Sequence, residues 1–114
     1  MRPELGTLHD IVDSARLARE YVKDLSLEQF RGDSLHQDAV CRRLLVIGEA
    51  VRRLSVSVRE RHPGLPWERI VGLRNVLVHQ YDEIDWSTVW VILERDLPAQ
   101  IAELGPTVDQ ALRE

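Results

Sequence analysis

Residues 74–81 combine side chain types that could cleave a phosphodiester bond without a metal ion. The segment holds Arg74, Asn75, His79 and Tyr81 among apolar neighbours. The planar guanidinium of an arginine can bind a phosphate through charge-assisted, bidentate hydrogen bonds. A histidine titrates near neutral pH, so its ring can both accept and donate a proton. Together the two side chains supply phosphate binding and acid–base catalysis.

The spacing of these residues on a helix predicts how they could form one site. Asn75 and His79 form an i,i+4 pair and are neighbours on one helix face. On an ideal helix with about 100° per residue, Tyr81 projects within about 20° of Arg74, whereas His79 projects about 140° away from it. Either Arg74 reaches around the helix, or the helix distorts near His79, or a second copy of the chain completes the site. Since one chain offers a single such histidine, we favour the second copy.

The sequence on both sides of this segment carries further ordered motifs. They are Ile-Gly-Glu-Ala at 47–50, Pro-Gly-Leu-Pro-Trp at 63–67, Gly-Leu-Arg-Asn at 72–75, Val-Trp at 89–90 and Asp-Leu-Pro at 96–98. In this order, from about Leu8 to Leu104, the chain resembles the HepT-like branch of the HEPN superfamily. The family motif is Arg, four residues, His, one residue, Tyr. Arg74, His79 and Tyr81 match it without departure, and Gln80 stands where the family often has glycine.

The resemblance implies a small, all-helical toxin encoded beside a minimal nucleotidyltransferase antitoxin. We therefore expect a metal-independent endoribonuclease that acts as a homodimer on RNA. His79 would be the general base on a 2′-OH or the general acid on the leaving oxygen, and Arg74 would stabilise the phosphate. Asn75 would orient the histidine or the phosphate. Cleavage would leave a cyclic phosphate, which requires the 2′-OH of RNA.

The resemblance also implies that the antitoxin modifies Tyr81 with a nucleotide, in the manner of AMPylation. From the helical projection, the added group would lie in the phosphate site of Arg74. A second hypothesis is a non-catalytic helical partner of a nucleotidyltransferase, in which Arg74 and His79 bind a nucleotide or the partner's surface. The intact set of Arg74, His79 and Tyr81 favours the nuclease.

Other polar residues could support this site. Glu49 lies in a central apolar helix, where a carboxylate is costly to bury unless it is paired, so we expect it to bind Arg74 or another arginine. A purely structural ion pair is the first interpretation of Glu49, and a role in orienting the site is the second. Arg52 and Arg53 either contact RNA or pair with surface acids, and the sequence favours neither interpretation.

Several other residue types have simpler interpretations. The three tryptophans fit helical packing stripes, so we expect them in the core or in a dimer interface. Cys41 lies in an apolar helix pattern and is expected to be a core residue. The remaining histidines lack the spacing of metal ligands, and no cofactor motif is present, so we expect neither a metal nor a cofactor. They are His9, His36 and His62.

Size and composition bound the class of protein. The chain has 114 residues and a net charge of −4, with 44% hydrophobic and 30% charged residues. These values predict one globular domain, residues 1–114, that does not bind RNA through bulk charge. No apolar run is long enough to span a membrane, and no signal peptide is apparent, so a cytoplasmic protein without membrane contact is expected.

Apolar residues at helical spacing predict an all-α, up-and-down bundle of four to five helices. The expected long helices span about 7–24, 34–54, 66–81 and 85–104, with short turns near 26–30 and 58–62. Ser26 with Gln29 resembles a capping box, and Asp85 is expected to cap the last long helix. Pro98 should kink or restart that helix, and Gly105 with Pro106 should end it, leaving a polar tail at about 105–114.

Overall fold

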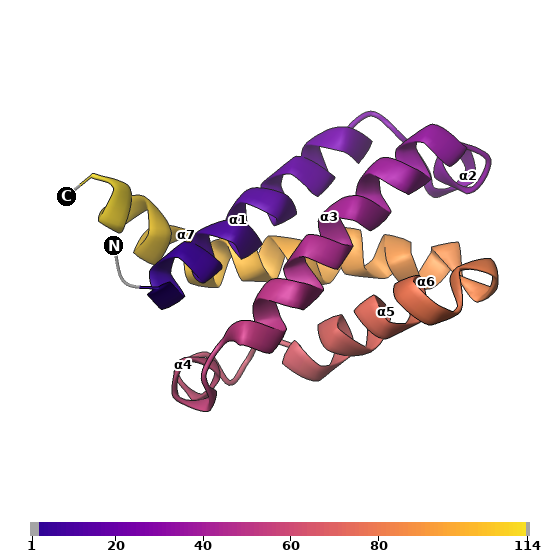
Figure 1. The fold of residues 1–114 in the computed structure, drawn as a ribbon. Helices are drawn as coiled ribbons and strands as arrows, with labels where there is room; N and C mark the ends of the chain where they lie inside the picture. Colours follow the sequence, from indigo (N-terminus) through magenta and orange to yellow (C-terminus); the bar gives the residue numbers. More distant parts are fainter. Residues whose placement is uncertain (1–2, 114) are drawn as a thin grey trace.

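Helices account for nearly all of the structure, which is a computed structural model that describes residues 3–113 (Figure 1). The expected all-α fold is confirmed, and no strand occurs in this part of the chain. The longest elements are α1 (Pro3–Val22), α3 (Ser34–Arg53), α5 (Trp67–His79) and α7 (Leu97–Leu112). The shorter ones are α2 (Leu27–Arg31), α4 (Val56–Glu60), the 3-10 turn η1 (Tyr81–Glu83), α6 (Trp86–Val91) and the π-helical η2 (Ile92–Asp96).

The long helices run alternately up and down the bundle. α3 lies beside both α1 and α5, and α6, η2 and α7 form one continuous helical run that returns alongside α1 (Figure 1). The short α2 and α4 lie at opposite ends of α3, where the chain reverses direction. This order places α3 at the centre, with α5 packed on one of its sides.

Side-chain caps begin α2 and α6, where the sequence predicts them, and also α3. The Ser26 side chain accepts a hydrogen bond from the Gln29 backbone N, and the Gln29 side chain accepts one from the Ser26 N at 2.9 Å, which is the expected capping box. Asp33 caps α3 through the His36 N at 3.0 Å. Asp85 caps α6 through the Ser87 N at 2.9 Å. Each cap satisfies a backbone N–H that the helix itself cannot.

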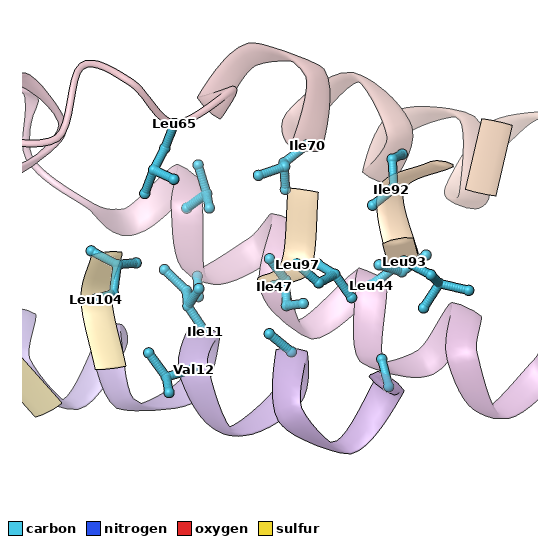
Figure 2. Close-up of a cluster of buried hydrophobic side chains, with 14 of the residues drawn as sticks. Ile11, Val12, Leu44, Ile47, Leu65, Ile70, Ile92, Leu93, Leu97 and Leu104 are labelled. Atoms are coloured by element: carbon cyan, nitrogen blue, oxygen red, sulfur yellow. The ribbon is translucent and has the colours of Figure 1, made fainter. Parts of the chain in front are cut away.

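The core is formed by aliphatic side chains from all four long helical segments (Figure 2). Those labelled in the figure are Ile11, Val12, Leu44, Ile47, Leu65, Ile70, Ile92, Leu93, Leu97 and Leu104, each at most 7% exposed. Full burial of such a side chain contributes about 1.5–3 kcal/mol to stability. None of the helices in residues 3–113 is long and apolar enough to cross a membrane.

The three tryptophans pack against the core, which is one of the two places, core or dimer interface, where the sequence predicts them. Phe30 of α2 is fully buried between Trp86 and Trp90, with ring centroids 5.6 and 5.4 Å away. Trp67 is 8% exposed, and its Nε1 donates a hydrogen bond to the His62 carbonyl at 3.0 Å. These contacts tie α2 to α6 and fix the start of α5.

The last helix continues beyond the glycine and proline that were expected to end it. α7 runs to Leu112 with Pro106 inside it, so the prediction of a polar tail from about residue 105 was wrong. Val108 is 2% exposed, and Arg16 of α1 binds Asp109 through a bidentate ion pair of 2.9 and 3.1 Å. These contacts hold the final turns against α1, at a point where the local proline signal alone predicts a stop.

Candidate active site

Helix α5 contacts α3 very closely at Gly48. An ideal Cβ at Gly48 would lie 2.4 Å from the Cβ of Arg74 and 2.7 Å from its Cγ, which is too close for two carbon atoms. Only glycine therefore allows the stem of Arg74 to lie on the surface of α3. The Ile-Gly-Glu-Ala segment thus provides both the contact point for Arg74 and, at Glu49, a carboxylate beside it.

The guanidinium of Arg74 is held by two acceptors. Its Nε donates a hydrogen bond to Glu49 Oε1 at 2.5 Å, its Nη2 contacts the same oxygen, and its Nη1 donates to Asn75 Oδ1 at 3.1 Å. The Arg74 side chain is 16% exposed, and that of Glu49 is 43% exposed. Since Nη1 carries two hydrogens and Asn75 accepts one, the group keeps donor capacity for a phosphate. The pairing of Glu49 with Arg74 is the contact expected from the sequence; whether it orients a reaction stays a prediction.

His79 is the last residue of α5 and is exposed. Its side chain makes no hydrogen bond or ion pair with any of residues 3–113. The helix is regular up to His79, and the Arg74 side chain binds α3 instead of reaching around α5. Two of the three arrangements considered for joining Arg74 and His79 are therefore absent from the single chain. Completion of the site by a second copy stays a prediction.

Tyr81 lies outside the motif helix. α5 ends at His79, Gln80 has non-helical backbone angles (φ −137°, ψ 41°), and Tyr81 begins the 3-10 turn η1. Its hydroxyl donates a hydrogen bond to Asp38 Oδ1 of α3 at 2.7 Å. This hydrogen bond, together with partial burial, raises the pKa of Tyr81 to about 12. The phenol is therefore protonated at neutral pH.

The helical projection that put Tyr81 over Arg74 was wrong, because the helix ends between them. Asp38 and Glu49, their partners on α3, are eleven residues apart in the chain. On an ideal helix this spacing gives about 16 Å along the axis, with both residues on nearly the same face. Tyr81 and Arg74 therefore contact α3 at separate points. The sequence reasoning missed Asp38; its position on the face of α3 that also carries Glu49 was the available signal.

The two arginines considered for RNA binding are half exposed and loosely paired. Arg52 Nη1 lies 4.0 Å from Glu49 Oε1, the oxygen that also binds Arg74. Arg53 Nη2 lies 3.7 Å from Asp10 Oδ2 on α1. Arg52 thus borders the Arg74 site, whereas Arg53 is on the α1 side. RNA binding by either residue stays a prediction.

The other titratable residues are placed away from this site or in the core. His36 binds Asp33 at 2.6 Å, and His62 binds Glu103 at 2.7 Å. Within residues 3–113, no group of three His, Cys, Asp or Glu side chains is arranged to hold a metal ion. Cys41 is buried as expected, and burial raises the pKa of its thiol to about 12.

Comparison with known proteins agrees with the motifs and with the helical fold. A family model described as "Ribonuclease HepT-like" matches residues 11–105. A Methanocaldococcus jannaschii protein named "Putative RNase" is 41% identical over 91 residues, which cover 80% of this chain and 84% of that protein. A Caldanaerobacter subterraneus protein, also named "Putative RNase", is 34% identical over 91 residues, covering 80% of this chain and 81% of that protein.

A Thermococcus cleftensis protein named "Probable ribonuclease HepT" is 32% identical over 92 residues, covering 81% of this chain and 84% of that protein. No solved structure matches the chain significantly. The family match spans most of the chain and includes Arg74, His79 and Tyr81, the residues that the sequence singled out. The chain therefore belongs to the ribonuclease HepT-like family, of the HEPN type.

Proposed function

We propose that the protein is a metal-independent endoribonuclease and that Arg74 and His79 are its catalytic residues. The main support is the contrast between these two side chains in a HepT-like chain. Arg74 is fixed by Glu49 and Asn75, whereas His79 is exposed and has no partner in residues 3–113. A fixed cation suits a phosphate-binding role, and a free imidazole suits proton transfer to and from a substrate.

In this mechanism, His79 removes the proton of an RNA 2′-OH or protonates the leaving 5′-oxygen. Arg74 binds the scissile phosphate and stabilises the charge that develops on it. Glu49 keeps the guanidinium in place, and Asn75 accepts a second hydrogen bond from it, one helical turn before His79. The attack of the 2′-oxygen yields a cyclic phosphate and a free 5′-hydroxyl.

The geometry of α5, on which Arg74 and His79 face about 140° apart, supports a homodimer in which each site takes one residue from each chain. We expect a mixture of His79→Ala and Arg74→Ala chains, unfolded and refolded together, to recover about a quarter of the wild-type cleavage rate. Half of the dimers would be mixed by random pairing, and each of these would hold one intact site. The measurement is the cleavage rate of the mixture against that of each variant alone, with light scattering to establish the dimer. A mixture of dimers as inactive as its components contradicts a site shared in this way.

We further propose that the protein is the cytoplasmic toxin of a toxin–antitoxin pair and that a nucleotidyltransferase neutralises it by adding a nucleotide to Tyr81. Tyr81 is 44% exposed, so its side chain can be reached by a partner enzyme. The transferred phosphate would replace the proton shared with Asp38 and put negative charge next to this carboxylate. Repulsion would then release the η1 turn from α3, directly after His79.

The prediction for Tyr81 is that Tyr81→Phe stays toxic and resists neutralisation. Phenylalanine keeps the ring but lacks the acceptor oxygen, and η1 loses only its hydrogen bond to Asp38. Intact-mass spectrometry after coexpression with the adjacent nucleotidyltransferase tests it. We expect one or more nucleotide masses on wild type and none on Tyr81→Phe. The matched control is Tyr21→Phe on α1, which should still be modified. An unmodified wild type contradicts the proposal.

The second candidate function is that of a non-catalytic subunit of a nucleotidyltransferase complex. Expressing this chain alone distinguishes it from the ribonuclease. An endoribonuclease toxin slows growth and fragments cellular RNA, and His79→Ala abolishes both effects. Purified enzyme should cleave RNA equally well after metal ions are removed with a chelator. Unimpaired growth and intact RNA with the folded wild-type chain would favour the non-catalytic subunit.

A further inference from the structure

A cavity of about 270 Å³ opens on the side of α5 that faces away from α3. Its walls are mainly aliphatic and come from three elements: Leu73 and Val76 of α5, Ile84 after η1, and Ile92 of η2. Glu83 and Thr88 lie at its polar edge. An apolar hollow with a few polar groups is the usual form of a small-ligand site.

The cavity lies on the face of α5 that also carries His79, which does not itself line it. The chain leaves it at Val76, passes through His79, and re-enters it at Glu83. On an ideal helix, His79 projects about 20° from Gly72, which also lines the cavity, but about 140° from Arg74. A group bound here is therefore on the same helix face as the proposed proton-transfer residue, and Val76, the last residue of α5 in the lining, precedes His79 by three positions.

The charges at the cavity exclude a phosphate as its occupant. Glu83 and Asp85 are both acidic, and the cation in the lining, Arg69, is already bound by Asp96 through hydrogen bonds of 2.8 and 2.6 Å. An anion would meet the two carboxylates of Glu83 and Asp85, with which Arg69 forms no ion pair. An uncharged, flat and partly apolar group fits better.

We propose that this cavity binds one nucleobase of the RNA, adjacent to the scissile phosphate, and selects bases that carry an amino group. The inference rests on the proposed ribonuclease function. Unstacked bases of single-stranded RNA are bound in this way, with their faces on side chains and their edges hydrogen bonded. The Glu83 carboxylate accepts from an amino N–H. Thr88 Oγ1 donates to Asp85 at 3.2 Å, so its lone pairs are free to accept a second N–H.

Cytosine, adenine and guanine have an exocyclic amino group, and uracil has none. We therefore expect wild type to cleave beside an amino-bearing base faster than beside uracil. In Glu83→Gln, the neutral amide oxygen is a weaker hydrogen-bond acceptor than the carboxylate, and the amide nitrogen adds two N–H donors. This change should reduce the preference about tenfold, the discrimination expected for one good base contact. The substrates are single-stranded RNA oligonucleotides that differ only in the base next to the cleaved bond.

Two further variants define the site. Glu60→Gln makes the same chemical change on the exposed α4, away from the cavity, and should leave the base preference unchanged. Gly72→Leu adds a side chain at the edge of the cavity, where a Cβ would meet no heavy atom within 4 Å. It should fold normally, as judged by circular dichroism and melting temperature, and lower cleavage of every oligonucleotide.

Binding separates failure of this inference from failure of the nuclease. The 2′-deoxy forms of the oligonucleotides lack the attacking hydroxyl, so their affinities report the cavity without catalysis. The site is supported if wild type prefers amino-bearing bases in both binding and cleavage, and if Glu83→Gln reduces both preferences. If wild type cleaves RNA and Glu83→Gln has the same base preference as wild type, the base site is wrong but the ribonuclease function is not contradicted. Loss of the dimer in Gly72→Leu, with base preference unaltered in Glu83→Gln, also overturns it and assigns the cavity to a second copy.

Discussion

Replacing His79 by alanine should lower the rate of RNA cleavage by ~10²–10⁴-fold, the usual contribution of a positioned acid–base group. The fold should be unaffected, because the side chain is exposed and contacts no other residue between 3 and 113 by hydrogen bond or ion pair. The measurement is the single-turnover cleavage rate of a defined RNA. His9→Ala on α1 is the matched control and should cleave at the wild-type rate.

The pH dependence of the cleavage rate is a second test of the role of His79. A general base acts only when deprotonated and a general acid only when protonated, so a single histidine acting as the base gives a rate that rises with pH, and two copies acting as acid and base give a bell-shaped profile. His79→Ala should flatten either profile. A folded His79→Ala protein that cleaves at the wild-type rate would falsify the assignment of His79.

Replacing Gly48 by alanine should both destabilise the protein and reduce cleavage. The new Cβ would lie 2.4 Å from the Cβ of Arg74, so α5 must move away from α3. Overpacking of this kind costs about 1–3 kcal/mol, which more than offsets the ~0.5–1 kcal/mol that alanine contributes over glycine within a helix. Displacement of Arg74 would also weaken its hydrogen bond to Glu49 and its hold on a phosphate.

Gly72 provides the matched control, because it lies in the same α5 but has no heavy atom within 4 Å of an ideal Cβ. Gly72→Ala should therefore raise the free energy of unfolding by about 0.5–1 kcal/mol, through helix propensity alone. Urea denaturation of both variants measures the difference. A Gly48→Ala protein at least as stable as Gly72→Ala would contradict the close contact between α3 and α5.

The sequence predicted the helices well where the signal is local. The apolar period indicated each long helix, and the caps at Ser26 and Asp85 could be predicted because a cap depends on residues within a few positions of the helix start. The same local reasoning failed at Gly105 and Pro106, because the contacts that keep α7 helical come from Arg16, far away in the chain.

The candidate site shows the same limit. The residue types and spacing of Arg74, His79 and Tyr81 were sufficient to indicate phosphodiester chemistry and the family. They could not show that α5 ends before Tyr81 or that its hydroxyl would contact Asp38, because both depend on how η1 packs on α3. By contrast, the ion pair of Glu49 could be predicted, because a carboxylate beside the glycine of a close helix contact needs a nearby cation.

The π-helical turn before Pro98 bears on which insertions and deletions the family can tolerate. A π-turn is an α-helix with one additional residue, so deletion of one residue from Ile92–Asp96 would regularise the helix and keep α6 and α7 in phase. In a regular α-helix, however, the ring of Pro98 would collide with the carbonyl four residues earlier. The number of residues in this turn and the presence of the proline therefore depend on each other. We expect homologues that are one residue shorter in this turn to lack the proline, and those that keep the proline to keep the additional residue.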